Sequence, residues 1–437
     1  MNPTVYIVHH VDTEGPLYED VKETFKRLEE ILKIRLPCKP TQANLDLLRK
    51  GKIDGIEENI TKQIRVIADP HLLDYKKSWA EVDEMLYRIL PSDFRKKFQD
   101  SFGHGWVFNW HVMDHVGFTV NPRHRDMGYL NIFDHYESIL DETGAISVDE
   151  INWHFHPVPF DKKANTCATS YENCYDILHQ ILSRRLIEKL WFPMVNRAGM
   201  HTERPDSNWF LEQWIPFDAS NQSIDDDDYI PNGRFGDWSG APKDWSIYQP
   251  DIYDWRKVGS CNRYIARCLN MNTRFRNLSK TELKKSFDLA RNSQKNVYVG
   301  VTNHDFRELS TEVADFYTML KCVSEEYPDV NFAFSRSTEA FKDVIGLPRN
   351  RMLNFDAVIE SNVMKVSFSQ GEPFGPQPYL AIKTRNGEYR HDNFDFGDFK
   401  RDYYYTFDYN TTNLEDVERL VIATNDKYGN QCIKRII

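Results

Sequence analysis

The chain has 437 residues, of which 41% are hydrophobic and 28% charged, a composition typical of a globular protein with a sizeable core. Lys and Arg number 55 against 66 Asp and Glu, a net charge of −11, which argues against nucleic-acid and membrane partners. No stretch approaches the roughly 18 apolar residues of a membrane span, and no signal peptide is evident. The 7 cysteines include no C-x-x-C pair, so we expect a cytoplasmic protein without a disulfide framework.

The predicted elements alternate between strands and helices. The first apolar run, Val5–Val11, ends at Asp12 and is typical of a buried strand. Residues 21–34 have apolar side chains near helical spacing and predict an amphipathic helix on the outside of the fold. This alternation indicates a mainly parallel sheet, either doubly wound or closed as a barrel. Further strands are expected at 106–112, 151–155, 191–195, 297–301 and 331–334, and helices at 175–190, 280–292 and 312–326.

Carboxylate, imidazole and guanidinium side chains follow the C-terminal ends of these expected strands. An α/β barrel assembles its active site there, because its loops converge from strands far apart in sequence. We therefore favour an α/β fold class with a distorted (β/α) barrel over residues 1–346.

From residue 347 onward the pattern changes to alternating and aromatic segments separated by turn residues. We expect residues 347–437 to form a small β-sandwich-like accessory domain. Its strands are expected at 362–370, 378–386, 403–410 and 419–426. Earlier in the chain, residues 220–251 form a long irregular stretch whose acidic run, 225–228, we interpret as a solvated loop and not as a cation site.

Two motifs carry the residues of a candidate metal site. Asp12 and Glu14 end the first strand, where one carboxylate could bind a cation while the other accepts a proton; the alternative is a loop pair or a helix cap. His154 and His156 are two apart on a strand and so share a face. Two imidazoles and a carboxylate make the open three-ligand site of hydrolytic Zn²⁺. Alternatively, both histidines satisfy hydrogen bonds in the core.

Further candidates end later strands. Arg197 could hold a catalytic carboxylate ionised, or form a surface ion pair. His304, followed by Asp305, offers an imidazole for general acid catalysis, although single histidines are often structural. His10 is a further possible ligand or base. Other polar residues expected near the rim are Asp114, His115, Arg125, His201, Glu203, Asp237 and Trp238.

In this order, the motifs DxE, HxHP, RxG, DAS and HD resemble the polysaccharide deacetylase family, which is carbohydrate esterase family four with its chitooligosaccharide deacetylase homology domain. The resemblance covers about residues 5–344. It implies a distorted (β/α) barrel of the polysaccharide deacetylase type. It also implies a divalent metal, generally zinc, that serves to hydrolyse the amides of N-acetylated sugars or the esters of O-acetylated sugars.

The resemblance also implies a role for each residue. Catalytic roles fall to Asp12 as base, His304 as acid to the leaving amine and Arg197 as the residue that orients the base. The metal ligands would be Glu14, His154 and His156, and Asp218 would be the family's fourth-motif aspartate. We predict Asp218 as a substrate contact, together with Asp114 and Trp238 from their expected position at the rim. The sequence departs from the family pattern in three places. Arg197-Ala198-Gly199 lacks the usual proline-tyrosine, so that a backbone N–H or another side chain must donate to the oxyanion. Thr13 separates the first two acids, which implies a longer reach to the metal, and Asn152 stands where a histidine is usual, so that His154 substitutes for it.

The sequence therefore predicts a Zn²⁺-dependent amidohydrolase that removes an acetyl or formyl group from an amino sugar. Its substrate would be a small molecule or oligosaccharide, a precursor in surface polysaccharide synthesis such as that of lipopolysaccharide or O-antigen. Two alternatives remain open: a catalytically silent glycan-binding protein on the same barrel, and a hydrolase of a non-sugar C–N bond.

Overall fold

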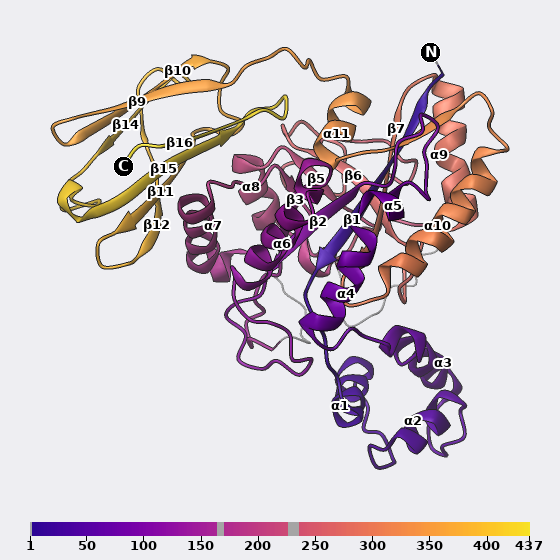
Figure 1. Ribbon diagram of the computed structural model, residues 1–437. Coiled ribbons are helices and arrows are strands. Elements are labelled where there is room, and N and C mark those ends of the chain that lie inside the picture. Colours follow the sequence, from indigo (N-terminus) through magenta and orange to yellow (C-terminus); the bar gives the residue numbers. More distant parts are fainter. Residues whose placement is uncertain (1, 164–169, 226–235) are drawn as a thin grey trace.

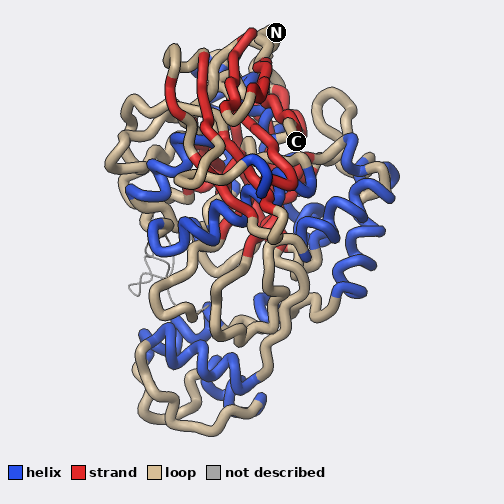
Figure 2. Tube along the Cα trace, turned by 90° about the vertical axis from the view of Figure 1, so that its left-hand side faces the viewer, coloured by secondary structure: helices blue, strands red, loops and turns tan. Residues whose placement is uncertain are grey.

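A computed structural model describes residues 2–163, 170–225 and 236–437. Its largest part is a parallel barrel with helices outside it, followed by antiparallel sheets at the C-terminal end of the chain (Figure 1). Figure 2, turned by 90°, shows the strands gathered in the middle of the molecule with helices on both flanks. The predicted barrel followed by a β region is confirmed at this level.

The barrel closes on its first strand, β1 (Thr4–Thr13). One edge of β1 pairs with β7 (Val297–His304) along nearly its whole length. The other edge is divided, because β8 (Asn331–Phe334) pairs with the first half of β1 and β2 (Phe108–Asp114) with the second half. The ring is completed in the order β2-β3-β4-β5-β6-β7. Its other strands are β3 (Glu150–Phe155), β4 (Val195–Asn196), β5 (Phe217–Asn221) and β6 (Tyr264–Asn270).

The strand expected at 191–195 is wrong in position, since β4 contains only Val195 and Asn196. Pro193 has no backbone N–H to donate to a sheet. The carbonyls of Phe192 and Pro193 instead accept hydrogen bonds from the side chains of Gln431 and Asn425 in the C-terminal region.

The outer helices of the barrel come from the loops between its strands. They are α4 (Trp79–Ile89), α5 (Ser92–Arg95), α6 (Asn131–Glu142), α7 (Tyr175–Lys189), α8 (Pro205–Trp214), α9 (Lys280–Ser293), α10 (Leu309–Ser324) and α11 (Ser337–Ile345). A large apolar cluster joins α4, α5, α6, α9 and α10 to the sheet, and in it Val5, Ile7 and Val11 of β1 are fully buried. Alternate residues of β1 thus face the helices, which leaves the intervening residues for the barrel interior.

A small helical subdomain interrupts the chain between β1 and β2. It consists of α1 (Val21–Leu32), α2 (Gln42–Arg49) and α3 (Glu58–Ile67) and projects beyond the C-terminal end of β1 (Figure 1). The expectation that residues 21–34 cover the outside of the fold is wrong. Phe25 and Leu28 of α1 pack with Leu45 and Ile64 of α2 and α3 in a separate apolar cluster. Periodicity reveals an apolar face of a helix but not what that face packs against.

Antiparallel strands make up the C-terminal region in two 4-stranded sheets, ordered β13-β14-β10-β9 and β12-β11-β15-β16. The sheets enclose an apolar cluster of their own. The other face of the second sheet packs on the barrel, where Tyr379 and Val421 join Leu182 of α7 and Trp214 of α8 in one core. The strands are β9 (Asn354–Glu360), β10 (Val363–Gln370), β11 (Tyr379–Thr384), β12 (Tyr389–Asp392), β13 (Asp395–Phe396), β14 (Asp402–Thr406), β15 (Val417–Asn425) and β16 (Gln431–Arg435).

Within the ranges described above, no helix is long and apolar enough to cross a membrane. The same ranges contain six of the cysteines, and all of these are free: Cys38, Cys174, Cys261, Cys268, Cys322 and Cys432. In the acidic run, Asp225 is exposed and pairs with Lys285, whereas residues 226–228 lie outside the described part of the chain.

Candidate metal and catalytic centre

Strand register brings Asp12 and His304 together. Asp12 of β1 lies directly opposite His304 of β7, and laterally adjacent residues of parallel strands share a face of the sheet. His304 Nε2 lies 3.8 Å from Asp12 Oδ2 and 3.9 Å from Glu14 Oε1. The carboxylate pair of β1 and the imidazole of β7 therefore form one group at the C-terminal mouth of the barrel.

His154 near the end of β3 and His156 just after the strand complete this group. His154 Nε2 and His156 Nε2 are 2.9 Å apart, and His156 Nε2 is 3.8 Å from Glu14 Oε1. Ligand atoms of Glu14, His154 and His156 all lie within 4.8 Å of one another. Two imidazoles and one carboxylate in such a cluster fit a Zn²⁺-like cation and leave a coordination position free.

Neighbouring groups orient these candidate ligands. His154 Nδ1 donates to the carbonyl of Arg197 at 2.8 Å, which leaves the Nε2 lone pair directed at the cluster. Arg125 Nη2 lies 2.6 Å from Glu14 Oε2 and so leaves Oε1 for a cation. Burial raises the pKa of Glu14, but Arg125, His304 and His156 outweigh it and lower the pKa to about 2. Glu14 is therefore ionised at neutral pH, as a metal ligand must be.

Arg197 holds Asp12 in the charged form. Its Nε donates to Asp12 Oδ1 at 2.7 Å and its Nη1 to the carbonyl of Ala219 at 3.0 Å, with both charged side chains buried. Burial opposes ionisation of Asp12, but Arg197, His154 and His304 together keep its pKa well below the usual range. An ionised, oriented carboxylate beside a candidate metal site is able to accept a proton.

Asp305 fixes the loop that carries Glu14. Its carboxylate accepts hydrogen bonds from the backbone N–H of Glu14 at 2.9 Å, the N–H of Gly15 at 2.8 Å and the hydroxyl of Tyr136 at 2.8 Å. Burial raises the pKa of Asp305 to about 7. The sequence placed Asp305 beside His304 but gave it no role, and nothing in the sequence pointed to Tyr136 on α6. Asp305 is a positioning residue.

Some predicted residues are not brought to the centre. Both ring nitrogens of His10 are engaged deeper in the barrel, with His111 at 2.7 Å and the Tyr298 hydroxyl at 2.9 Å, so His10 supplies neither ligand nor base. Asp114 pairs in register with Phe155, next to His154 in the chain, and therefore occupies the opposite, helix-facing side of the sheet. There it forms a buried ion pair with Arg185.

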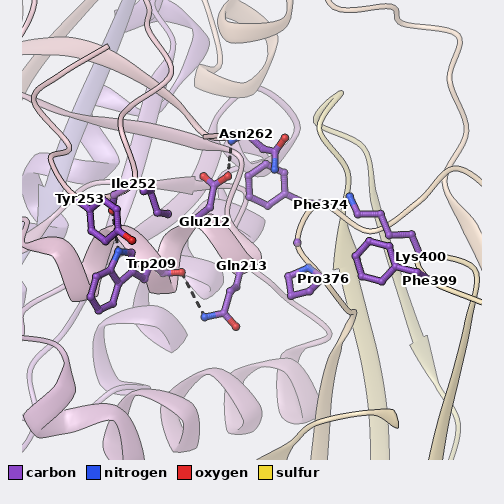
Figure 3. A pocket seen from close by; sticks show the side chains of 11 residues that line it. Trp209, Glu212, Gln213, Ile252, Tyr253, Asn262, Phe374, Pro376, Phe399 and Lys400 are labelled. Atoms are coloured by element: carbon purple, nitrogen blue, oxygen red, sulfur yellow. Dashed lines mark hydrogen bonds between the residues drawn. The ribbon is translucent and has the colours of Figure 1, made fainter. Parts of the chain in front are cut away.

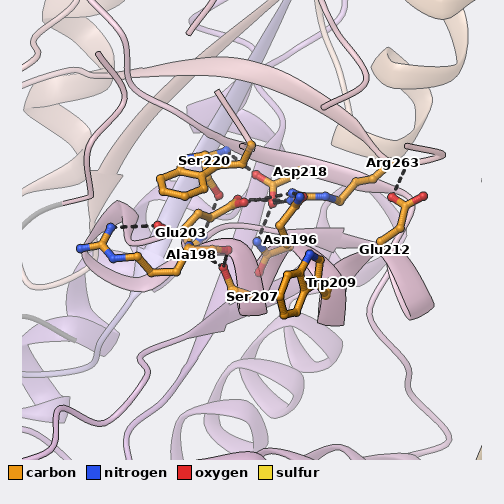
Figure 4. A network of polar contacts seen from close by, with 12 residues as sticks. Asn196, Ala198, Glu203, Ser207, Trp209, Glu212, Asp218, Ser220 and Arg263 are labelled. Atoms are coloured by element: carbon orange, nitrogen blue, oxygen red, sulfur yellow. Dashed lines mark hydrogen bonds and ion pairs between the residues drawn. The ribbon is translucent and has the colours of Figure 1, made fainter. Parts of the chain in front are cut away.

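Asp218 belongs to a second buried network, shown in Figure 4. Arg263 Nη1 donates to Asp218 Oδ2 at 2.6 Å, and Arg263 Nη2 lies 3.0 Å from Glu203 Oε2. Asn196 also donates to Asp218 at 2.7 Å. These side chains pair with one another and are fully buried, which indicates a structural role in place of the predicted substrate contact. The other predicted contact, Trp238, is 0% exposed, and its indole N–H donates to a backbone carbonyl.

Of the other residues predicted near the rim, some lie close to the centre and one does not. Arg125 and His201 do contact the centre, Arg125 through Glu14 and His201 through Arg197 Nη2 at 3.4 Å. His115 lies near His156, with ring centroids 6.1 Å apart. By contrast, Asp237 forms a partly exposed ion pair with Arg256.

A pocket of about 640 Å³ lies apart from this centre, between α8 and the C-terminal sheets (Figure 3). Trp209 of α8 and Phe374, which follows β10, are among its lining residues. None of the residues of the candidate metal cluster lines it.

No family model matches the chain, and neither curated proteins nor solved structures give a match. The resemblance to polysaccharide deacetylases thus stays a prediction. The functional inference rests on the chemistry of the centre itself.

Proposed function

We propose that the protein is a metal-dependent amidohydrolase of the polysaccharide deacetylase type, which removes an acetyl or formyl group from an amino sugar. One observation carries the proposal: Glu14, His154 and His156 present ligand atoms within 4.8 Å of one another beside an ionised carboxylate, Asp12, and an imidazole, His304. A cation site, a base and a proton donor are the parts that hydrolysis of an amide requires.

In this proposal each residue has one task. A divalent cation, Zn²⁺ by its donor set, would polarise the acyl carbonyl and activate a water molecule. Asp12 accepts the proton of that water, and Arg197 keeps Asp12 charged and oriented until it does so. As the C–N bond breaks, the proton passes through His304 to the leaving nitrogen. Burial lowers the pKa of His304 to about 4, so the imidazole is neutral and able to relay a proton at pH 7.

The sugar portion of the substrate is inferred from the order of the motifs, which resembles that of carbohydrate deacetylases. A precursor of a surface polysaccharide, modified in the cytoplasm, agrees with this order and with the free cysteines. His304 is the member of the centre that remains accessible, with 20% of its side chain exposed. The acylated nitrogen would approach on that side.

The metal site is tested first, by elemental analysis of protein purified without chelator. We expect about one zinc-like ion per chain, and its loss in the His154→Ala, His156→Ala double variant, because that variant removes two of the three candidate ligands. His104→Ala, at an exposed histidine, is the matched control and should keep the ion. Wild-type protein without metal, or a double variant with unchanged stoichiometry, would refute the site.

Activity is tested by measuring acetate and formate released from N-acylated amino sugars and their nucleotide conjugates. Release by the metal-loaded protein, abolished in the double variant, supports the proposal. A protein that binds the metal and such sugars but releases no acyl group would instead be a glycan-binding protein.

A further inference from the structure

Arginine side chains gather beside the centre around a single tyrosine. We define the arginine cluster as Arg27, Arg123, Arg274 and Arg307 around Tyr75, which precedes α4. Arg123 Nη2 donates to the Tyr75 hydroxyl at 2.7 Å, and the guanidinium of Arg307 lies 6.0 Å from the Tyr75 ring. Arg274 and Arg307 both direct an Nη2 at the carbonyl of Leu72, at 3.5 and 3.4 Å.

Positive charge is in excess in this cluster. Glu19 pairs with Arg27 at 2.9 Å and with Arg123 at 2.8 Å. Within the ranges described above, neither Arg274 nor Arg307 forms an ion pair with a carboxylate, and the buried Nε of Arg307 has no hydrogen-bond partner. The carboxylates whose charge reaches Arg307 are Glu312 and Glu14, and Glu14 already pairs with Arg125.

The excess positive charge of the arginine cluster also affects the pKa of Tyr75. Burial raises the pKa of Tyr75, but Arg123, Arg274 and Arg27 outweigh it and lower the pKa to about 8. An anion placed among these guanidinium groups would reverse that effect, because it would oppose formation of the phenolate.

The cluster lies against the centre through one aromatic side chain. The Phe306 ring stacks on His304 with centroids 4.8 Å apart, and the Tyr75 ring meets Phe306 edge-on at 5.6 Å. Arg307 follows Phe306 in the chain, and its guanidinium lies 5.6 Å from the Phe306 ring. A molecule whose reacting nitrogen lies at His304 thus has the arginine cluster as the neighbouring subsite.

Buried guanidinium groups without counter-ions are costly, and planar guanidinium pairs are suited to binding the oxygens of phosphate or carboxylate. We propose that Arg123, Arg274, Arg307 and Tyr75 bind an oxyanion of the substrate, a phosphoryl or carboxylate group on the same molecule as the acylated amine. This inference rests on the proposed function for the identity of that molecule, but the anion subsite itself can be tested without any turnover.

The binding test uses inorganic phosphate and glucuronate as probes, at constant ionic strength against chloride. Tyrosinate absorbance should titrate near pH 8 in the free protein, be absent in Tyr75→Phe, and shift to higher pH when a probe binds. Arg274→Gln and Arg307→Gln should each weaken probe binding by about tenfold or more, the effect of losing one charge-assisted hydrogen bond. Arg291→Gln, at a surface ion pair with Asp329, is the matched control and should bind like wild type.

The two probes distinguish a phosphoryl from a carboxylate ligand. Arg274→Lys keeps the charge and should recover part of the binding lost in Arg274→Gln, which separates loss of the subsite from misfolding. Absence of any probe binding above the chloride control, or equal binding by wild type and both glutamine variants, would overturn the proposal.

A second experiment measures hydrolysis of neutral and anionic substrates. It compares N-acetylglucosamine with its phosphates, and N-acetylated amino sugars with their uronic acids. Arg307→Gln should raise KM for the anionic member of a pair by about tenfold and change KM little for the neutral member. If the probes bind but no acylated sugar is hydrolysed, the anion subsite stands and the proposed function fails. If neutral and anionic sugars are hydrolysed equally well and no probe binds, the proposed function stands and the anion subsite fails.

Discussion

At the scale of single residues, the centre depends on charges that are buried and yet compensated. Asp12 is ionised inside the barrel because Arg197 donates to it at 2.7 Å. Asp114 also forms a buried ion pair, with Arg185 on the helix-facing side of the sheet, but there burial outweighs the guanidinium and raises the pKa of Asp114. The two buried ion pairs thus lie on opposite faces of the sheet, that of Asp12 beside His304 and that of Asp114 against the helices. This difference makes them a matched pair for experiment.

Asp12→Asn should retain the metal, since Glu14 and the two histidines supply its ligands, and should lose turnover by about 10²–10⁴-fold, the usual contribution of a general base. The change also leaves Arg197 buried without a counter-charge, which we expect to cost about 3–5 kcal/mol of unfolding free energy. Turnover, metal content and thermal melting are measured together.

The control for this variant is Asp114→Asn, which breaks the ion pair with Arg185. A comparable loss of stability with turnover retained would assign the catalytic effect to Asp12. If Asp12→Asn instead loses the ion, Asp12 is a metal ligand and the base lies elsewhere.

At the scale of elements, successive residues of a strand face the barrel interior and the helices in turn. This alternation decides which polar residues reach the mouth of the barrel. The sequence was sufficient to predict Asp12, Glu14, His154, Arg197 and His304, because each follows or ends an apolar run. The sequence alone could not show whether Asp114 and Asp218 face the barrel interior or the helices, since this depends on the register with the neighbouring strands.

Other elements were beyond prediction for different reasons. β5 is short and contains Asp218, Ser220 and Asn221, so it has no apolar signature. Tyr75, Tyr136 and Arg274 come from helices and loops whose approach to the centre is a property of the tertiary fold.

The loop after β1 gives a prediction at this scale. Gly15 has φ of +70°, and a Cβ there would lie 2.9 Å from the Trp79 ring, so the loop is held to one shape. In Asp305→Asn the amide would turn an N–H₂ group towards one of the donors of Glu14, Gly15 or Tyr136. We expect zinc affinity to fall by about 10–100-fold, as for other groups that support ligands, and kcat per bound metal to change less.

Competition with a chelating dye measures this affinity. Asp329→Asn, at an exposed aspartate, serves as the control. Unchanged zinc affinity in Asp305→Asn would remove its positioning role.

At the scale of the whole molecule, the barrel and the C-terminal sheets share one apolar core, so we expect the predicted domains, residues 1–346 and 347–437, to unfold together. Imidazoles take part in this contact. His179 of α7 stacks on His391 of β12 with centroids 4.5 Å apart, and His391 stacks on Tyr379 at 4.2 Å.

This contact should make the protein sensitive to acid. Burial lowers the pKa of His391 to about 4 and that of His179 to about 3, against 6.5 in the unfolded chain. Between pH 6.5 and 4 the unfolded state therefore binds more protons, so the stabilisation is complete above pH 6.5 and is lost as pH falls. At pH 5 the loss for His391 is about 2 kcal/mol.

Denaturant unfolding at pH 8 and pH 5 measures this effect. In His391→Gln the loss between the two pH values should be smaller by about that amount, and His104→Ala should behave like wild type. An equal pH dependence in wild type and His391→Gln would show that the stacked imidazoles do not control acid stability.

The position of β1 also has a consequence for how the chain reaches its native state. β1 pairs with β7 and β8, whose residues lie about three hundred positions later in the chain. Such pairings carry a high loop-closure cost, and folds dominated by them form slowly. One edge of β1 can pair early with β2, but the edge that takes β7 stays without its partner until residues 297–304 have been made. Assembly of the centre, which needs Asp12 and His304 side by side, must therefore wait until β7 has been made.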